Sequence, residues 1–389
     1  MKTPKLTPVL SSQLAYLPYQ LITNTDNKYL KVSGDIKRQF IFNKEKASFH
    51  GKTGGIFGIG RKSEGFALVG IGKGKYKEEM VVTVRGTKTI HNWITNGNIG
   101  LKGSPNGAIA HSGFVNAFYS IKPDLKRFIL SQPHMPKHIH CVGHSLGGAL
   151  ASLVSDWVTE EFKIPVSLYT FGAPRIGQES YARKSESRNT NIFRCTHGAD
   201  PVPLIPLWPF IHAPFSNKEY RLDDSCGLYF STHGMGPNDV PGYINTARCN
   251  SWDELKEQSV AYLNKPVRLN FDDKHQVAYT SRWANLLSAA LVTLLNDAGP
   301  RHAKAMEIQA RLSGGMTFYD KLAKELEGIV SASDKLRDQT IGLLGHMLVF
   351  AGRSVSKITD LSSSFIRWVF KVTIDKLYST AKQAFDSIF

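Results

Sequence analysis

The chain has 389 residues, of which 42% are hydrophobic and 21% are charged. This length suggests about two domains, and the composition excludes a disordered chain, a collagen-like rod and a disulfide-stabilised miniprotein. The 48 Lys and Arg residues exceed the 32 Asp and Glu residues by a formal charge of +16, so nucleic acid and anionic lipid should both attract the protein.

We expect neither a membrane-spanning helix nor an N-terminal signal peptide. The longest apolar runs are shorter than the roughly 18 residues that a membrane-spanning helix needs, so we expect a soluble protein. Lys2 and Lys5 are not followed by an apolar segment with a cleavage site, so we expect synthesis in the cytoplasm without a Sec signal peptide. Four cysteines are too few for a disulfide framework, and their redox state stays open.

The first two thirds of the chain alternate between strand-like and helix-like segments. A short helix over residues 8–22, broken near Pro18, precedes glycine-bounded apolar runs typical of strands. The alternation after Gly113 predicts an α/β fold with a mostly parallel sheet flanked by helices, because parallel strands need crossover connections. The predicted strands are 56–59, 66–71, 80–84, 138–142, 166–171 and 191–196, and the crossover helices are 114–130 and 146–162.

The last third of the chain has a different amino-acid composition. Glycine and β-branched runs give way to Ala, Leu, Lys and Ser with apolar residues near a 3.6-residue period, which is typical of helices. We therefore predict an α/β domain over residues 1–265 and an α-helical C-terminal domain over residues 266–389. The predicted helices are 282–295, 302–312, 318–330, 332–350 and 354–389.

A strand-to-helix junction contains the most informative motif. Residues 143–147 read Gly-His-Ser-Leu-Gly, after an apolar strand and before an Ala-rich amphipathic helix. A G-x-S-x-G turn in this context lifts the serine hydroxyl clear of the sheet, whereas the same letters elsewhere describe an ordinary glycine-rich turn. The context favours Ser145 as a nucleophile.

A serine hydroxyl is a weak nucleophile, so it needs a histidine base and a carboxylate that orients the base. Asp200 follows the predicted strand 191–196 and precedes Pro201, which favours it as the acid, although an Asp-Pro turn alone would explain the pair. Hydrolases of this turn type have the order Ser, Asp, His. That order leaves five histidines: His212, His233, His275, His302 and His346.

Several motifs together resemble the class 3 lipase family across residues 15–260. They are VTVRGT with Asn92-Trp93, HSGF at 111–114, GHSLGGALA at 143–151, YTFGAPRIG at 169–177 and DPVP at 200–203. The resemblance implies an α/β-hydrolase fold, a Ser-Asp-His triad and hydrolysis of acyl esters in lipids, with no metal and no cofactor.

The resemblance also implies the roles of individual residues. Ser145 and Asp200 match the nucleophile and the acid, and His233 in an H-x-M…Y segment matches the base, although residues between Met235 and Tyr243 look inserted and His275 stays an alternative. Thr87 and the backbone N–H of Leu146 match the oxyanion hole. Residues 89–100, with Trp93, match the lid.

Two further segments admit two interpretations each. The apolar loop 204–210, with Trp208, would line an acyl-chain groove or pack beneath the C-terminal helices. His138 and His140 form an H-x-H pair that lacks further metal ligands at suitable spacing, so a structural role is favoured. No glycine-rich stretch matches G-x-x-x-x-G-K-[ST], which argues against nucleotide binding.

These features lead to a hypothesis of a serine hydrolase of the phospholipase A type that acts on membrane phospholipid. The alternatives are a housekeeping triacylglycerol lipase and a membrane-binding or pore-forming protein with an inert hydrolase core. The added helical region makes the chain similar to bacterial type VI secretion lipase effectors, which act in the periplasm of target cells. That similarity implies an immunity protein and a secretion apparatus as partners, and no nucleic acid.

Overall fold

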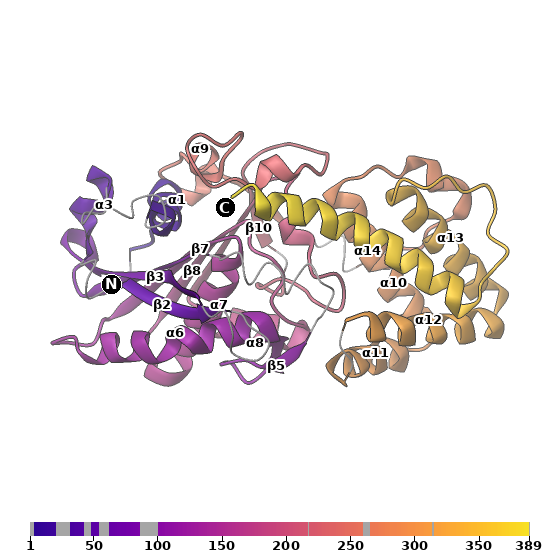
Figure 1. Cartoon of the computed structure of the whole chain (residues 1–389), viewed down its shortest axis with the longest axis horizontal. Coiled ribbons are helices and arrows are strands. Elements are labelled where there is room, and N and C mark those ends of the chain that lie inside the picture. The colour runs from indigo at the N-terminus through magenta and orange to yellow at the C-terminus, as the bar shows by residue number, and fades with distance from the viewer. Residues whose placement is uncertain are drawn as a thin grey trace.

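The structure is a computed structural model that describes residues 4–20, 32–42, 48–53, 62–85, 100–216, 218–259, 265–312 and 315–388. The predicted strand over residues 56–59 lies outside these ranges. In Figure 1 the molecule is elongated, with a sheet-containing part at one end and a group of helices at the other.

A nine-stranded sheet forms the centre of the first part, in the order β1-β3-β4-β7-β8-β9-β10-β11 with β2 paired to β3. The central strands β4, β7, β8, β9 and β10 are parallel, and the outer pairs are antiparallel. The strands are β1 (Phe40–Phe42), β2 (Ser48–Thr53), β3 (Lys62–Gly72), β4 (Glu79–Val84), β7 (His138–His144), β8 (Val166–Phe171), β9 (Asn191–Thr196), β10 (Lys218–Arg221) and β11 (Lys256–Ser259). A separate ribbon pairs β5 (Leu101–Gly103) with β6 (Ile109–His111).

Helices cover both faces of this sheet. The helices α6 (Ser112–Leu130) and α7 (Leu146–Phe162) pack against each other on one face, and α1 (Pro8–Tyr16) lies on the other (Figure 1). Every residue of β7 and β8 is buried, as expected for central parallel strands whose two faces are both covered. The other α-helices of this part, among the described residues, are α3 (Gly34–Gln39), α8 (Glu179–Arg188) and α9 (Tyr243–Thr246).

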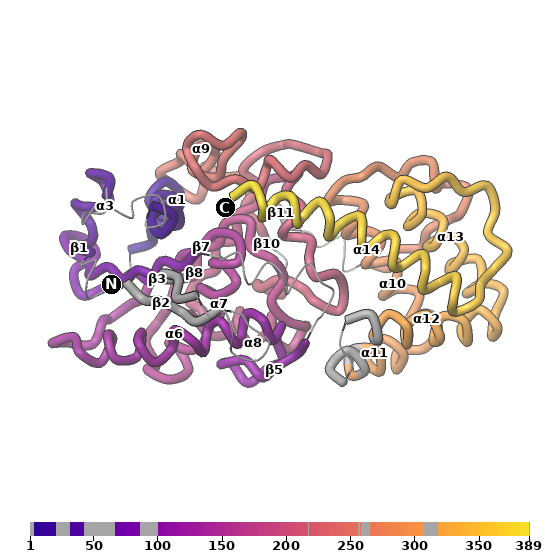
Figure 2. The backbone as a smooth tube through the Cα atoms, viewed as in Figure 1, coloured from indigo at the N-terminus to yellow at the C-terminus, as the bar shows by residue number. Residues whose placement is uncertain are grey.

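Five helices form the second part. They are α10 (Ser281–Ala298), α11 (Pro300–Leu312), α12 (Gly315–Ala332), α13 (Asp334–Phe350) and α14 (Ser363–Asp386). The expected start of the last helix at residue 354 is wrong, because α14 begins at Ser363, after Ser362 accepts a hydrogen bond from the amide of Phe365 as the N-cap. The tube in Figure 2 follows α14 from the far end of the helical group back to the sheet.

One cluster of buried apolar side chains extends through both parts of the molecule. It includes Val82 and Ile139 of the sheet, Leu150 of α7, and Leu291 and Val369 of the C-terminal helices. A second cluster lies on the other face of the sheet and includes Leu10 and Tyr169. The domain boundary at residue 265 stays a prediction, and the packing across it is continuous.

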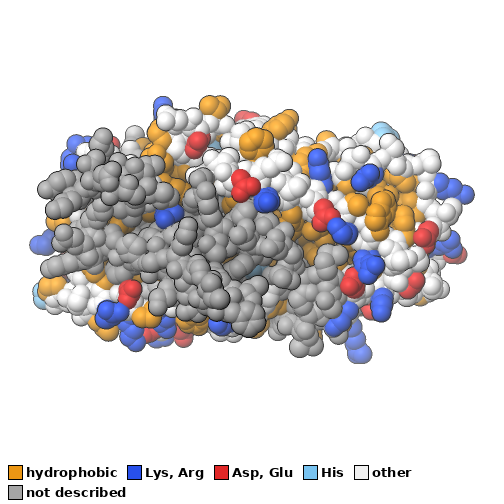
Figure 3. Space-filling view, viewed as in Figure 1, with side chains coloured by type: hydrophobic (Ala, Val, Ile, Leu, Met, Phe, Trp, Pro, Cys, Tyr) orange, Lys and Arg blue, Asp and Glu red, His pale blue; other side chains and the backbone are white. Residues whose placement is uncertain are grey.

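The surface of the helical part mixes charges of both signs. In Figure 3, Lys and Arg side chains are spread among Asp and Glu and do not gather into one basic stripe on the face that is drawn. Within the described ranges, none of the helices combines the length and apolar character that a transmembrane span requires.

Candidate active site

Ser145 occupies the tight turn between β7 and α7. Its backbone has φ 59° and ψ −134°, a conformation that a non-glycine residue adopts only under strain. The turn also needs glycine beside it, since a Cβ on Gly147 would lie 2.2 Å from the carbonyl oxygen of Val84 in β4. Local sequence therefore explains why the hydroxyl is presented at the end of the central strands.

The side chains of Ser145, His233 and Asp200 form one hydrogen-bonded chain. Ser145 Oγ lies 2.8 Å from His233 Nε2, and His233 Nδ1 lies 2.8 Å from Asp200 Oδ2. His233 is contributed by the 3-10 turn η5 (Phe230–His233), and Asp200 follows β9. A hydroxyl, an imidazole and a carboxylate in this order can activate the hydroxyl by removing its proton.

The carboxylate of Asp200 has further partners that hold its orientation. Tyr243, at the start of α9 (Tyr243–Thr246), donates its hydroxyl to Oδ2 at 2.7 Å, and the amide of Val202 donates to Oδ1 at 2.9 Å. The ring of His197 stacks on Tyr243 with centroids 3.8 Å apart. The sequence alone identified Tyr243 only as the last residue of the H-x-M…Y segment and did not predict its contact with Asp200. The position of Tyr243 after His233 in that segment was the one indication of such a role.

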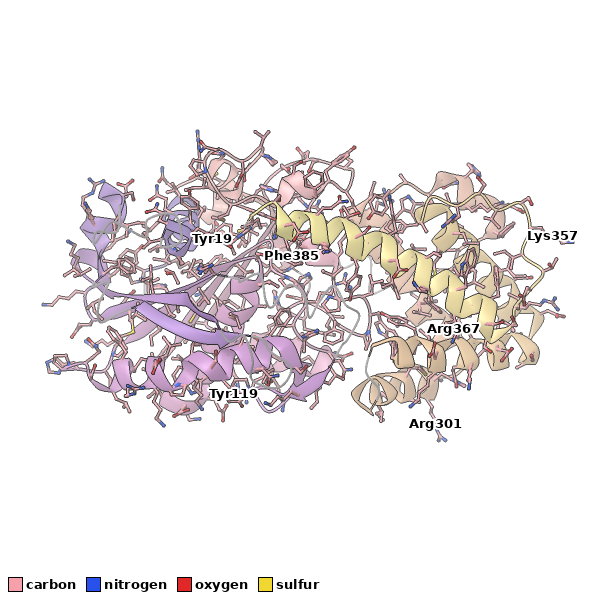
Figure 4. All side chains as sticks on the ribbon, in the orientation of Figure 1. Tyr19, Tyr119, Arg301, Lys357, Arg367 and Phe385 are labelled. Atoms are coloured by element: carbon pink, nitrogen blue, oxygen red, sulfur yellow. The ribbon has the colours of Figure 1, made fainter. Side chains whose placement is uncertain are left out.

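His144 supports the backbone of His233 from the other side. Its Nε2 donates to the carbonyl oxygen of His233 at 2.9 Å, and its Nδ1 accepts from the hydroxyl of Tyr19 at 2.8 Å. Burial, together with the neighbouring His233, lowers the pKa of His144 well below its ordinary value, so the ring is neutral. Tyr19 ends the short turn η1 (Leu17–Tyr19), and Figure 4 labels it near Phe385.

The hydrogen-bonded chain is closed off from solvent. Ser145 and His233 are 0% exposed and Asp200 is 1% exposed. The ring of Phe385, near the end of α14, contacts the ring of His233. A site from which water is excluded strengthens the electrostatic interactions inside it.

Residues 81–210 match the family model described as Lipase (class 3). Over this segment, about a third of the chain, the sequence is similar to class 3 lipases. The matched residues include most of β4, all of β7, β8 and β9, the Ser145 turn and Asp200, whereas His233 lies beyond them.

Curated relatives are similar over parts of their length. The secreted mono- and diacylglycerol lipase 1 of Fusarium solani is 34% identical over 151 residues, which are 38% of this chain and 45% of the relative. The chloroplastic phospholipase A(1) DAD1 of Arabidopsis thaliana is 27% identical over 152 residues, which are 33% of this chain and 34% of the relative. The chain thus spans less than half the length of either class 3 lipase relative.

Solved structures resemble the chain as well. The triacylglyceride lipase of Rhizomucor miehei aligns with a TM-score of 0.43 at 22% identity and covers 55% of this chain and 78% of its own. Lipase II of Rhizopus niveus aligns with a TM-score of 0.42 at 20% identity, with the same two coverages. The α/β-hydrolase fold expected from the resemblance is present, since a parallel central sheet lies between helices and the Ser145 turn follows β7.

The residues predicted for the oxyanion hole and the lid are described only in part. Leu146 is the first residue of α7, where an amide N–H has no acceptor within the helix. Thr87, Trp93 and all but the last residue of the expected lid over residues 89–100 lie outside the described residues.

The alternative histidines are held by local partners. His275 is exposed, with its Nδ1 2.9 Å from the carbonyl oxygen of Asp272. His212 contacts the carbonyl oxygen of Pro203, His302 pairs with Glu325, and His346 contacts the carbonyl oxygen of Gly342. Among the described residues, His233 is the histidine whose ring lies within hydrogen-bonding distance of Ser145 Oγ.

The two ambiguous segments have structural partners. Trp208 packs on Phe318 of α12, with centroids 5.8 Å apart, so the loop 204–210 lies beneath the C-terminal helices. His138 bonds to Ser167 at 3.0 Å and His140 bonds to Glu79 at 2.7 Å. Within the part of the chain that the structure describes, no group of three or more His, Cys, Asp or Glu side chains is arranged to hold a metal ion.

Proposed function

We propose that this protein hydrolyses acyl esters of lipids, with Ser145 as nucleophile, His233 as base and Asp200 as the acid that orients the base. The observation that carries the proposal is the unbroken chain of two 2.8 Å hydrogen bonds from Ser145 through His233 to Asp200, on a strained turn. Such a constellation is recognised by geometry and roles.

The proposed reaction begins when Ser145 Oγ attacks the ester carbonyl carbon while His233 Nε2 takes the hydroxyl proton. The carbonyl electrons move to the oxygen, where the amide N–H of Leu146 and a donor from Thr87 would stabilise the negative charge. The C–O bond to the leaving alcohol then breaks, and His233 returns its proton to that oxygen. Water repeats the sequence on the acyl-serine and releases the fatty acid.

We further propose a phospholipid as the substrate, cleaved in the manner of a phospholipase A. The net charge of +16 supports attraction to anionic membranes, and phospholipase A(1) is among the names of the relatives. Acylglycerols are the second candidate, because another relative is named a mono- and diacylglycerol lipase.

A product analysis tests both parts of the proposal. The purified full chain is incubated with vesicles of defined phospholipid and, separately, with emulsified diacylglycerol, and the products are identified by mass spectrometry. We expect lysophospholipid and fatty acid from the vesicles, and a loss of several orders of magnitude in Ser145→Ala. Ser152→Ala is the matched control, because Ser152 is buried in the same helix and bonds only to the carbonyl oxygen of Gly148. Equal activity of the Ser145→Ala variant would refute the mechanism.

The biological role that we propose is that of an antibacterial effector delivered to the periplasm of target cells, with an immunity protein as a partner. It is supported by the sequence resemblance and by the helical region attached to the lipase domain. Expression directed to the bacterial periplasm should be toxic, while cytoplasmic expression should not. Undiminished toxicity of Ser145→Ala would instead favour a membrane-binding or pore-forming protein whose hydrolase core is inert.

A further inference from the structure

A cavity of about 530 Å³ lies between the lipase sheet and α10. Its walls come from the ends of β9 and β10, from the loop after Asp200 and from α10, and neither Ser145 nor His233 lines it. A volume of this size is typical of small-molecule sites. The cavity is therefore a second concave site beside the proposed catalytic centre.

The walls of this cavity contain four cationic side chains and four carboxylates. Arg175, Arg194, Arg221 and Lys265 line it, and one carboxylate, Glu219, serves two of them. Glu219 lies 2.9 Å from Arg194 and 3.0 Å from Arg221.

The other carboxylates of the lining have partners elsewhere. Glu179 pairs with Arg183 and Asp297 pairs with Arg268, two arginines that do not line the cavity. Asp200 is engaged by His233 and Tyr243. Glu219 is therefore the lining carboxylate that forms ion pairs with lining cations, Arg194 and Arg221.

Arg175 is the most informative of the four. Only 7% of Arg175 is exposed. Its guanidinium donates to the side-chain amide oxygen of Asn285 at 2.9 Å and to the carbonyl oxygen of Pro206 at 3.5 Å. Both acceptors are neutral, and no ion pair joins Arg175 to a carboxylate among the described residues. A buried charge without a counter-charge is unfavourable, and a bound anion would remove that penalty.

Burial, with a contribution from Arg194, lowers the pKa of Arg175 to about 10, so the guanidinium stays charged at neutral pH. His212, which also lines the cavity, is neutral because burial and the two arginines Arg175 and Arg194 hold its pKa well below the ordinary value.

We propose that this cavity binds the phosphate group of a small organic phosphomonoester. A phosphomonoester carries nearly two negative charges at neutral pH and would supply the counter-charge for Arg175, whose acceptors are neutral. The forked donors of arginine suit phosphate oxygens. Leu204, Trp208 and Phe210 supply apolar surface for the organic part of the ligand. The cavity shares Asp200 with the proposed triad, but neither Ser145 nor His233 lines it, and phosphate binding does not require ester hydrolysis.

Calorimetric titration of the full chain tests the proposal with three probes in a phosphate-free buffer. The probes are inorganic phosphate, sn-glycerol 3-phosphate and an ether-linked lysophosphatidic acid, which has no acyl ester to hydrolyse, and glycerol is the neutral control. We expect saturable binding of sn-glycerol 3-phosphate and none of glycerol. Equal affinity for inorganic phosphate would identify the free ion as a sufficient ligand, and tighter binding of the ether lipid would identify a lipid headgroup. Both outcomes support the site.

Variants distinguish the cavity from general surface charge. Arg221→Gln and Lys265→Gln should each weaken binding of sn-glycerol 3-phosphate by about tenfold. Arg127→Gln should leave it unchanged, because Arg127 is exposed on α6 and pairs with Asp124. Arg175→Gln is not used for this comparison because it risks misfolding. The thermal midpoint of unfolding is measured as well. Added sn-glycerol 3-phosphate should raise this midpoint in the wild type and in Arg127→Gln but not in Arg221→Gln.

Three results would overturn the proposal. They are the absence of saturable binding of all three phosphate probes, an equal loss of binding in Arg127→Gln, and an affinity for acetate equal to that for sn-glycerol 3-phosphate.

Discussion

The ring of Phe385 stands edge-on to the imidazole of His233, with the ring centroids 5.6 Å apart and the planes at 88°. Phe385 belongs to the last turns of α14, and only 1% of its surface is exposed. Ala381 and Ala384 of the same helix are fully buried, and α14 packs on the turn η5 that carries His233. The C-terminal helix is therefore a wall of the proposed active site rather than a separate appendage (Figure 4).

Phe385→Ala should reduce both stability and turnover. Truncating a buried phenylalanine costs about 3 to 5 kcal/mol, and the loss of a packed neighbour allows the imidazole to leave its productive position, which should lower kcat by about tenfold or more. Phe370→Ala is the control, because Phe370 is equally buried in α14 but contacts Tyr319 instead of His233. Urea unfolding and ester hydrolysis are measured for both variants, and an equal loss of turnover in the two would refute a specific role for Phe385.

Tyr243→Phe should lower kcat by about tenfold and leave KM unchanged. Tyr243 donates to the same oxygen of Asp200 that accepts from His233, and its own oxygen accepts from the amide of His197 at 3.0 Å. A hydrogen bond to a charged group contributes about 1.5 to 3 kcal/mol, and the tyrosine does not approach the serine hydroxyl. Tyr169→Phe, which removes a buried hydroxyl that bonds to the amide of Leu6, should reduce stability alone. A rise in KM with constant kcat in Tyr243→Phe would argue against a positioning role.

Gly172→Ala should abolish most activity, because the new methyl group would enter the hydrogen-bonded chain. A Cβ at this position would lie 2.7 Å from Asp200 Oδ2 and 3.0 Å from His233 Nδ1. The position also has φ +56°, which costs alanine about 1 kcal/mol. Gly352→Ala isolates the backbone cost, since Gly352 has φ +77° with nothing within 4 Å of the added atom. We expect the larger loss of unfolding free energy in Gly172→Ala, because its methyl group also meets buried side chains. A loss of turnover of about 100-fold is expected only in Gly172→Ala; retained turnover there would contradict the geometry.

Local patterns predicted the central elements well. The strands β8 and β9 and the helix α7 coincide with the predicted ranges. The expected triad residues Ser145, Asp200 and His233 lie within hydrogen-bonding distance, although the choice among the histidines needed the family resemblance. Their catalytic roles stay a prediction until activity is measured.

Other features depend on contacts between distant segments. The strand β10 reads Lys-Glu-Tyr-Arg, so its polar sequence gave no strand signal, and it forms because β9 and β11 flank it. The 3.6-residue period of apolar residues predicted that α14 is helical, but no local pattern predicts the contact between Phe385 and His233. The sequence could not predict that several arginines line one cavity either, because Arg175 and Arg221 come from segments that are separate in sequence.

Acid should destabilise the protein through its buried histidines, and His111 provides a direct test. His111 is buried at the start of α6, where its Nδ1 accepts from the amide of Gly113 at 3.1 Å, and burial lowers its pKa from 6.5 to about 4. Between about pH 6.5 and about pH 4 the unfolded chain therefore binds a proton that the folded chain does not, so stability is lost as the pH falls through this window, by up to about 3 kcal/mol for this residue. His111→Asn keeps a capping acceptor and removes the titration, so its unfolding free energy should fall less between about pH 7 and about pH 5 than that of the wild type. Burial raises the pKa of the carboxyl groups of Glu79 and Asp156 to about 7, so these groups stabilise the folded chain as the pH falls, but they do so equally in the wild type and in the variant.

His275→Asn is the control for the His111 variant, because His275 is exposed. The unfolding free energy of His275→Asn should depend on pH as that of the wild type does. An unchanged pH dependence in His111→Asn would contradict the lowered pKa of His111.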